Sequence, residues 1–520
     1  MQKEIEKEKY RDLSRWHAFN LTLAIFAISI LPRIPALTRP VSKHHEFNAA
    51  IILIGIESWR QAGGGAGFHY APLMNYQHPG DLYPEKAVNI DNKGNELYLS
   101  LGPGWYIIPY AFFQLLHLPA TPLNLRLLSL LINGLTVILS FFLFEQLIPA
   151  GTSKRFTRIC TATALFMFSP GMLWYLGNGY VHVTALLPFL LLMLILLLPM
   201  LRSPENISAI PLSLLALSVI LSVYMDWFML FLCAAACPLT LFWARKNPKY
   251  FILTGVLFIS LFTGIALIFW QFASYTSTWT VAEYWRRRFV ERSFVNNSAP
   301  FTINLLSIAG HFVTAYLPVL LFILAGLVIH RVKKIPAGWS RTEIRFAILY
   351  TVALCLNMLV LNNWASQHEY SVVPAALLLA WIGATLFPAP AHNKFFVGSI
   401  GLFFILSTAQ FYYINPAGPI ARSGMPYNTY QTFGQHLRGI PPRDKIFANL
   451  PENCPMIDYY AGRNITLAQD SSEAKQMMRK WNIDTAIWVE SEEFQFKATR
   501  ILSTHPPSAP SHPAPPVIAK

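Results

Sequence analysis

Long apolar segments constrain this chain more than any other feature of its sequence. A bilayer span needs about 20 mostly apolar residues, and eleven segments meet this requirement. They cover residues 18–37, 123–148, 158–174, 182–201, 208–224, 228–244, 250–272, 304–330, 344–362, 371–388 and 395–414. Only 13% of the 520 residues are charged, which excludes an ordinary soluble enzyme, a disordered chain and a coiled coil. We therefore predict a mainly α-helical, polytopic membrane bundle of about 11 spans.

The distribution of Lys and Arg predicts the topology of this bundle. With residues 1–17 in the cytoplasm and 101–118 not spanning, basic residues fall in the cytoplasmic loops, whereas loops 175–181, 225–227 and 363–370 contain none. This pattern obeys the positive-inside rule, and it would be inverted if 101–118 crossed the membrane. We therefore expect 101–118 to be a re-entrant or interfacial helix. The first span lacks a following cleavage site, which indicates an uncleaved anchor, and we expect a multi-pass protein of the bacterial inner membrane.

This topology divides the chain into four parts. They are a cytoplasmic N-terminus (1–17), a transmembrane bundle (18–414) with outer loops 38–122 and 273–303, an extracytoplasmic α/β domain (415–500) and a Pro-rich disordered tail (501–520). In the α/β domain, 445–450 and 484–490 resemble buried strands, and 455–463 and 471–481 resemble helices. We expect the second helix to be capped at its Ser-Ser-Glu opening. Because no glycine fingerprint for a nucleotide is present, we favour a structural or lid role for this domain.

Polar residues gather at the predicted outer ends of the spans. The clusters are 44–46, 174–182 (including His182), 226–227, 283–292 and 364–370. A transporter is expected to place ionisable groups near the midplane, and these positions do not fit that expectation. The pattern indicates one polar outer cavity above an apolar groove. The net charge of +14 mostly reports topology, so we expect no nucleic-acid partner.

The segment His44-His45-Glu46 follows the first span directly. A carboxylate flanked by imidazoles can act as a general base, whereas three adjacent residues converge poorly on one metal ion. The alternative is a polar interfacial cap on the apolar stretch that follows. We expect no cofactor, and the sequence gives no support for a divalent metal site.

Two further features carry charge at the predicted outer side. Arg286, Arg287 and Arg288 lie outside, against the topological trend, and an Arg fork suits phosphate. They either clamp a lipid phosphate or pair with headgroups, Glu283 or Glu291. Asp226, at the end of a span, is either a catalytic residue or a helix cap.

The layout of spans, outer loops and polar residues resembles that of the GT-C superfamily of integral-membrane glycosyltransferases. The narrower resemblance is to the dolichyl-phosphate-mannose protein mannosyltransferases and the bacterial lipid A aminoarabinose transferase, and it covers about residues 15–500. Glu46 matches the second acid of the family's Asp-Glu pair, and His45 replaces the first. The segment 98–105 resembles the family's Lys-Pro-Pro-Leu region, but it lacks the lysine. Lys86, Lys93 or the arginine run would then have to contact the phosphate.

The resemblance implies an inverting transfer from a polyprenyl-phosphate sugar to an acceptor glycan, lipid or protein on the outer face. Glu46, assisted by His45, would be the base, with Asp226 as the competing candidate. The substrate-binding candidates are His44, Lys86, Arg286, Arg287, Arg288, His368, Glu369 and Tyr370. The alternatives are an O-antigen polymerase or ligase and a non-enzymatic flippase or transporter of lipid-linked sugars.

Overall fold

The chain divides into two compact units. The computed structural model describes residues 14–504, apart from 42–45, 86, 151, 153, 178, 296–298, 334–338, 387–393, 415–427, 452–453 and 493–494. We call residues 1–39, 68–71 and 99–424 the bundle unit, and residues 40–67, 72–98 and 425–520 the sheet unit. The predicted Pro-rich tail lies outside the described residues beyond position 504.

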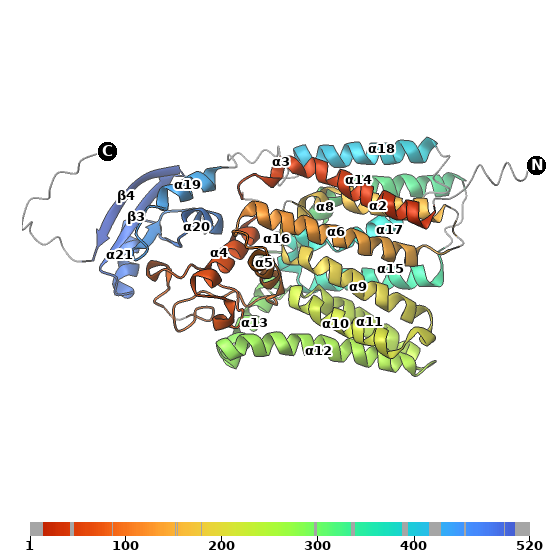
Figure 1. Ribbon diagram of the computed structural model, residues 1–520, viewed down its shortest axis with the longest axis horizontal. Coiled ribbons are helices and arrows are strands. Elements are labelled where there is room, and N and C mark those ends of the chain that lie inside the picture. Colours follow the sequence, from red (N-terminus) through yellow and green to blue (C-terminus); the bar gives the residue numbers. More distant parts are fainter. Residues whose placement is uncertain are drawn as a thin grey trace, which may run out of the picture. The chain divides into compact units, whose positions relative to one another are not determined.

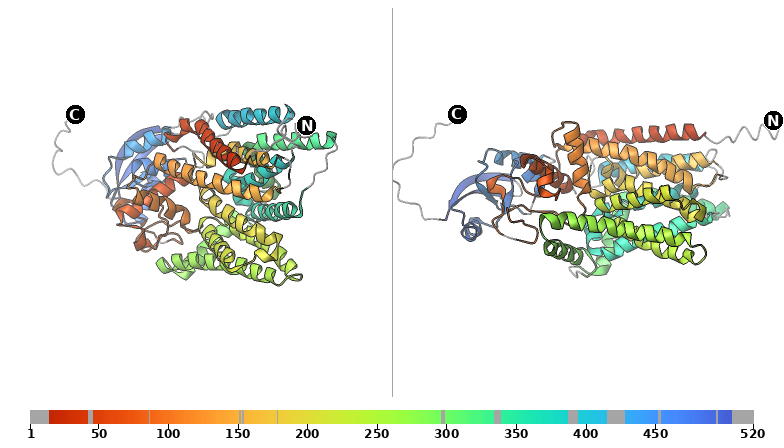
Figure 2. Two further views of the ribbon diagram at one scale, coloured as in Figure 1. Left: turned by 45° about the vertical axis from the view of Figure 1, so that its right-hand side comes forward. Right: turned by 60° about the horizontal axis from the view of Figure 1, so that its bottom comes forward.

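The bundle unit is helical, as predicted, and each of the eleven apolar segments contains a helix. The long helices lie lengthwise alongside one another (Figures 1 and 2). They are α2 (Arg15–Ile30), α6 (Pro122–Leu147), α7 (Arg155–Phe168), α9 (His182–Arg202), α10 (Ala209–Met225), α11 (Phe228–Ala244), α12 (Lys249–Tyr275), α14 (Phe301–Lys333), α15 (Arg341–Val360), α17 (Ala375–Leu386) and α18 (Lys394–Ala409). Among the described residues, seven helical segments are long and apolar enough to cross a membrane, and α10, α11 and α17 are shorter apolar helices.

Local sequence signals set the ends of these helices. The Thr121 side chain accepts a hydrogen bond from Asn124 N, and Pro122 opens α6. Ser340 and Glu343 form a capping box at α15, which satisfies two otherwise unpaired backbone donors. The single helix predicted over 158–174 is instead two, α7 and α8 (Pro170–Tyr175). Pro170 starts α8 because proline lacks the N–H that would continue the preceding helix.

Short elements of the bundle unit connect the long helices. They are η1 (Leu31–Arg33), α3 (Ile34–Leu37), α5 (Gly104–Leu115), α13 (Thr278–Arg292), η4 (Pro204–Asn206), α16 (Asn362–Gln367), η5 (Glu369–Val372) and η7 (Gln410–Ile414). Residues 101–118 contain α5, a helix of only 12 residues, and their re-entrant or interfacial placement stays a prediction. A Cβ at Gly102 would lie 2.4 Å from the carbonyl oxygen of Tyr224, so this approach to the end of α10 requires glycine.

The sheet unit contains a four-stranded mixed sheet, which confirms the predicted α/β character of the C-terminal region. The strand order is β2-β1-β3-β4. The strands are β1 (Lys445–Ala448), β2 (Ile465–Leu467), β3 (Thr485–Glu492) and β4 (Gln495–Ser503), and the helices are α4 (Phe47–Gln61), α19 (Thr429–Leu437), α20 (Pro455–Ala461) and α21 (Ser471–Lys480), with short turns η2 (Gly65–Phe68) and η3 (Pro79–Asp81). Strands β2 and β3 pair parallel to β1, and β4 pairs antiparallel to β3.

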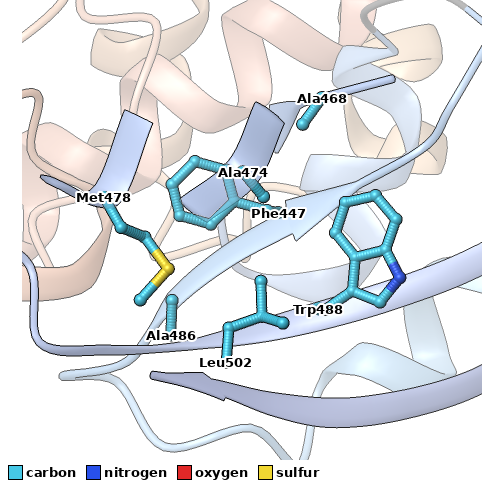
Figure 3. Close-up of a cluster of buried hydrophobic side chains, with 7 residues drawn as sticks. All are labelled: Phe447, Ala468, Ala474, Met478, Ala486, Trp488 and Leu502. Carbon is cyan, nitrogen blue, oxygen red and sulfur yellow. The ribbon is translucent and has the colours of Figure 1, made fainter. Parts of the chain in front are cut away.

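A small hydrophobic core forms between this sheet and α21. Phe447, Met478 and Trp488 are buried in it (Figure 3). The predicted helix end at Gly462 is confirmed, since this glycine adopts a left-handed conformation with φ of 64°. The cap of α21 was predicted at the serines, but it is Asp470, whose carboxylate accepts from Ser472 N and Glu473 N. Asp is as good an N-cap as Ser, and it stands one position earlier.

Residues 72–98 dock on the sheet through a buried ion pair. Arg463 Nε donates to the two carboxylate oxygens of Asp81 at 3.1 and 3.2 Å, and both side chains are almost fully buried. The same carboxylate accepts from Asn464 N at 3.1 Å. A Cβ at Gly80 would lie 2.4 Å from the carbonyl oxygen of Asp444, so the close approach also depends on glycine. This stretch of the predicted outer loop is therefore an integral part of the sheet unit.

Candidate functional site

A buried His–Asp pair lies at one end of the bundle unit. His182 is the first residue of α9, and Asp226 occupies the tight turn between α10 and α11. His182 Nδ1 contacts Asp226 Oδ2, and Asp226 Oδ1 accepts from Phe228 N at 2.6 Å. The two side chains are 3% and 7% exposed. Both carboxylate oxygens are therefore engaged, and Asp226 serves as a cap with an imidazole partner.

Aromatic rings surround this pair. The His182 ring meets Trp105 edge-on at 5.6 Å and Tyr370 edge-on at 5.3 Å, and Trp364 lies 6.1 Å away. His368 stacks on Tyr370 at 5.0 Å. The structure thus brings together Asp226, His368 and Tyr370, which the sequence placed in separate segments. Glu369 opens the neighbouring turn η5 and is half-buried.

The arginine run lies on α13, and its members differ in their surroundings. Arg286 Nε and Arg287 Nε donate to Glu283 at 2.8 and 2.7 Å. Hydrogen bonds from Arg286 and Arg287 lower the pKa of Glu283 to about 2. Arg288 instead pairs with Glu291 at 2.8 Å, and its guanidinium lies 5.5 Å from the centre of the Tyr284 ring. The Glu283 carboxylate therefore pairs with both of the first two arginines and offsets one of their two charges.

An apolar pocket of about 210 Å³ lies beside Arg288. Its walls come from α11, α13 and the end of α15. The residues that line it are Ser100, Trp227, Leu230, Phe231, Trp285, Arg288, Phe289, Arg292, Val360 and Leu361. Trp227 Nε1 donates to the carbonyl oxygen of Ser100 at 2.7 Å, and Arg292 donates to Ser100 Oγ at 3.1 Å. The pocket therefore combines apolar walls with two guanidinium groups one helical turn apart.

The remaining predicted residues lie in the sheet unit or outside the described residues. Glu46 directly precedes α4 and is 1% exposed. His44, His45 and Lys86 lie outside the residues that the structure describes. Lys93 is exposed and lines a different pocket, in the sheet unit. Within the described ranges, no three His, Cys, Asp or Glu side chains are grouped as metal ligands.

Two contributions to the site were not assigned in the sequence analysis. The sequence placed His182 in the polar cluster without a role, because its pairing with Asp226 spans 44 positions. Arg292 was read as part of a charged run, although its spacing of four from Arg288 places both on one helix face. That spacing was the available signal.

Comparison with known proteins gives a clear result only at the level of structure. No protein-family model matches the chain, and no curated protein matches its sequence. Among solved structures, ArnT from Cupriavidus metallidurans bound to undecaprenyl phosphate superposes with a TM-score of 0.58 over 91% of this chain and 92% of its own, at 11% identity. The chain has the fold of the GT-C transferases.

A second group of solved structures supports the same assignment of fold. The oligosaccharyltransferase AglB from Archaeoglobus fulgidus, in complex with an inhibitory peptide and a dolichol-phosphate, gives a TM-score of 0.56 at 12% identity over 91% of this chain and 69% of its own. Its apo form gives 0.55 at 13% identity over 92% and 70%. At these identities the likeness is one of fold. It confirms the resemblance inferred from the sequence across most of the chain.

Proposed function

We propose that this protein is a membrane glycosyltransferase that moves a sugar from a polyprenyl-phosphate donor to an acceptor hydroxyl on the extracytoplasmic face. The observation that carries the proposal is the likeness in fold to a transferase bound to undecaprenyl phosphate, over 91% of this chain. The acceptor is a glycan, a lipid or a protein, and the membrane is the bacterial inner membrane.

The apolar pocket on α13 supports donor binding. Aromatic and aliphatic walls suit an isoprenoid chain, which gains free energy by leaving water. A guanidinium presents a planar fork of donors that matches a phosphate, and Arg288 and Arg292 both line the pocket. We therefore assign the donor phosphate to Arg288 and Arg292. Arg286 and Arg287 pair with Glu283, and they contribute only to the overall positive charge of α13.

Glu46 is the proposed general base. It accepts the proton of the acceptor hydroxyl while the oxygen attacks the anomeric carbon and the bond from that carbon to the phosphate oxygen breaks. The phosphate leaves with the electron pair and needs no proton, so one base suffices and the anomeric configuration inverts. His44 and His45 directly precede Glu46 in the chain, and His45 would assist it.

Asp226 is the second candidate for the base. Its two oxygens contact His182 and Phe228 N, so proton transfer from an acceptor would have to disrupt the cap. We assign Asp226 a positioning role through His182. His368, Glu369 and Tyr370 complete the polar surface that would hold the sugar or the acceptor.

A deletion strain tests this proposal. Mass analysis of its surface glycans and lipids should show loss of one sugar and accumulation of the polyprenyl-phosphate sugar. Wild-type protein should restore the sugar, and the Glu46→Gln variant should not. A flippase would instead be restored by both, because transport needs no base, and a polymerase or ligase would change glycan length rather than one sugar.

A further inference from the structure

A polar pocket of about 420 Å³ lies within the sheet unit. One side is formed by residues between Pro79 and Gly94. The other is formed by the residues at the start of β1 and β3, among them Arg443, Lys445 and Thr485. This volume falls within the roughly 300–1,000 Å³ typical of small-molecule sites. The pocket is therefore large enough for a sugar-sized ligand.

The two sides of this pocket are held together by buried interactions. The Asp81–Arg463 ion pair joins them, and Arg463 also donates to the carbonyl oxygens of Ile440 and Pro441 at 3.0 and 2.6 Å. Gly80 N donates to the carbonyl oxygen of Pro442 at 3.1 Å. A site whose walls are fixed in advance loses little entropy on binding. The pocket is therefore preformed.

The charges that line the pocket leave an excess of positive charge. Glu85 is paired with Lys480 at 2.6 Å. Asp91 Oδ1 accepts from the backbone N of Lys93 and of Asn95, both at 2.8 Å, and so stabilises its own turn. Lys93, Arg443 and Lys445 outnumber these two acids in the lining, although Arg443 Nε also lies 4.0 Å from Asp444 Oδ1. An anion is the ligand that this balance favours.

Lys445 is the unusual member of this group. It is 3% exposed, and its Nζ lies 4.7 Å from the centre of the Tyr83 ring and 5.7 Å from that of Trp481. Nζ donates to the carbonyl oxygen of Leu82 at 3.4 Å, a long hydrogen bond. An ammonium has three donors, and no carboxylate of the described residues lies within ion-pairing distance of this one. Burial of its charge is costly. Asp81, Asp458 and Glu96 act on this charge from beyond ion-pairing distance, and an anionic ligand in direct contact would offset more of the cost.

We propose that this pocket binds the anionic group of an acidic sugar, either a phosphate or a carboxylate. Lys445 makes the buried contact, and Lys93 and Arg443 hold the anion at the rim. In a transferase this ligand is the acceptor, so that assignment rests on the proposed function. The binding itself does not rest on it, and it can be measured without a donor.

Calorimetric titration of the full-length protein in detergent tests the proposal. The ligands are glucose 1-phosphate, glucuronate and uncharged glucose. We expect one or both charged sugars to bind and glucose not to bind. Binding of the phosphate alone, or of glucuronate alone, identifies the anion. Replacing Lys445 by Met removes a charged donor but keeps an unbranched apolar side chain, and it should weaken binding about 10- to 100-fold.

Substitutions of exposed residues keep the test valid if Lys445→Met fails to fold. Lys93→Gln with Arg443→Gln changes only exposed side chains and should also weaken binding. Arg500→Gln, exposed on β4 away from the pocket, is the matched control and should bind as wild type does. The proposal is overturned if neither charged sugar binds, if glucose binds equally well, or if the Lys93/Arg443 double variant binds like the control. Absence of transferase activity with binding intact would overturn the proposed function alone.

Discussion

The pocket in the bundle unit and the pocket in the sheet unit differ in the chemistry of their walls. The first is about 210 Å³ in volume, and most of its lining is aromatic or aliphatic, with Arg288 and Arg292 as its cations. The second is about 420 Å³ and is lined by carboxylates, an amide and three cations, including Lys445. The first suits a chain with one charged end, and the second suits a hydrated anion. Under the two proposals above, the donor and the acidic sugar would be recognised in two separately built sites.

The positively charged residues of the two pockets also differ in where they lie in the chain. Arg288 and Arg292 lie one turn apart on a single helix, where their forks can share one phosphate. Lys445 lies at the start of a strand, in a pocket made by distant parts of the chain. A change in one pocket should therefore leave recognition by the other intact. The following predictions test this independence.

The largest expected effect comes from Glu46, the candidate base in the sheet unit. General-base assistance is typically worth about 10²–10⁴ in rate, so Glu46→Gln should lower kcat by that factor. Asp226→Asn in the bundle unit keeps the shape of the cap and should cost less activity. Steady-state transfer assays on both variants, with matched expression, measure the difference. A collapse with Asp226→Asn and near-full turnover with Glu46→Gln would move the base into the bundle unit, and parallel His45→Gln separates the remaining candidate.

The second effect is on the stability of the sheet unit. Arg463→Met removes one partner of a buried pair and leaves the Asp81 carboxylate buried, which typically costs about 3–5 kcal/mol. Limited proteolysis of the full-length protein should show faster cleavage within 72–98. Arg500→Gln is the exposed control and should be cleaved like wild type. Equal cleavage of all three proteins would mean that the ion pair does not hold this pocket together.

The third effect separates the members of the arginine run. Arg288→Gln with Arg292→Gln should raise the apparent KM for the donor by about 100-fold or more, because two charged hydrogen bonds to phosphate, each typically worth about 1.5–3 kcal/mol, are lost. Arg286→Gln with Arg287→Gln should change it little, since these side chains are exposed and pair with Glu283. Equal losses from the two double variants would indicate a diffuse electrostatic effect. Anion binding in the sheet unit should not change in either.

The smallest effect is a dependence of anion binding on pH. Burial lowers the pKa of Lys445 to about 8, so its ammonium loses its proton as the pH rises through 8. If only the charged form binds, affinity should fall about tenfold between pH 7 and pH 9. Titrations of Lys445→Met should show weak binding without this fall. A fall in affinity that persists in Lys445→Met would assign the titration to another group near the pocket. The other charged or titratable groups around Lys445 are Asp81, Tyr83, Glu85, Asp91, Lys93, Glu96, Arg443, Asp444, Asp458 and Arg463.

The helices were predictable because apolar runs and caps are local signals. Strand β4 was missed because most of its side chains are exposed, which leaves no alternating apolar pattern. Strand β2 was missed because it has only three residues. The break at Pro170 was hidden inside a continuous apolar run. The number of spans, their direction and the side of each loop remain predictions from the charge pattern.

The residue types at the sites were predictable, but their partners were not. The sequence placed Asp226, His368 and the arginines in polar clusters, and a cluster does not say which side chains meet. His182–Asp226 and Asp81–Arg463 join residues 44 and 382 positions apart, and a single sequence carries no signal for such contacts. Lys93 was considered as a phosphate contact, whereas Lys445 gave no signal because its burial depends on the docked segment 72–98.

Transfer of a labelled sugar by the purified protein tests the central claim most directly. The protein in sealed lipid vesicles is incubated with undecaprenyl-phosphate-linked sugars and an extract of the cell envelope. The label is followed by chromatography and by its accessibility from outside the vesicles. The account predicts that label moves from the lipid to an acceptor with inversion at the anomeric carbon, in wild type and not in Glu46→Gln. Label that only changes sides of the bilayer, equally in both proteins, would contradict it and would indicate a transporter.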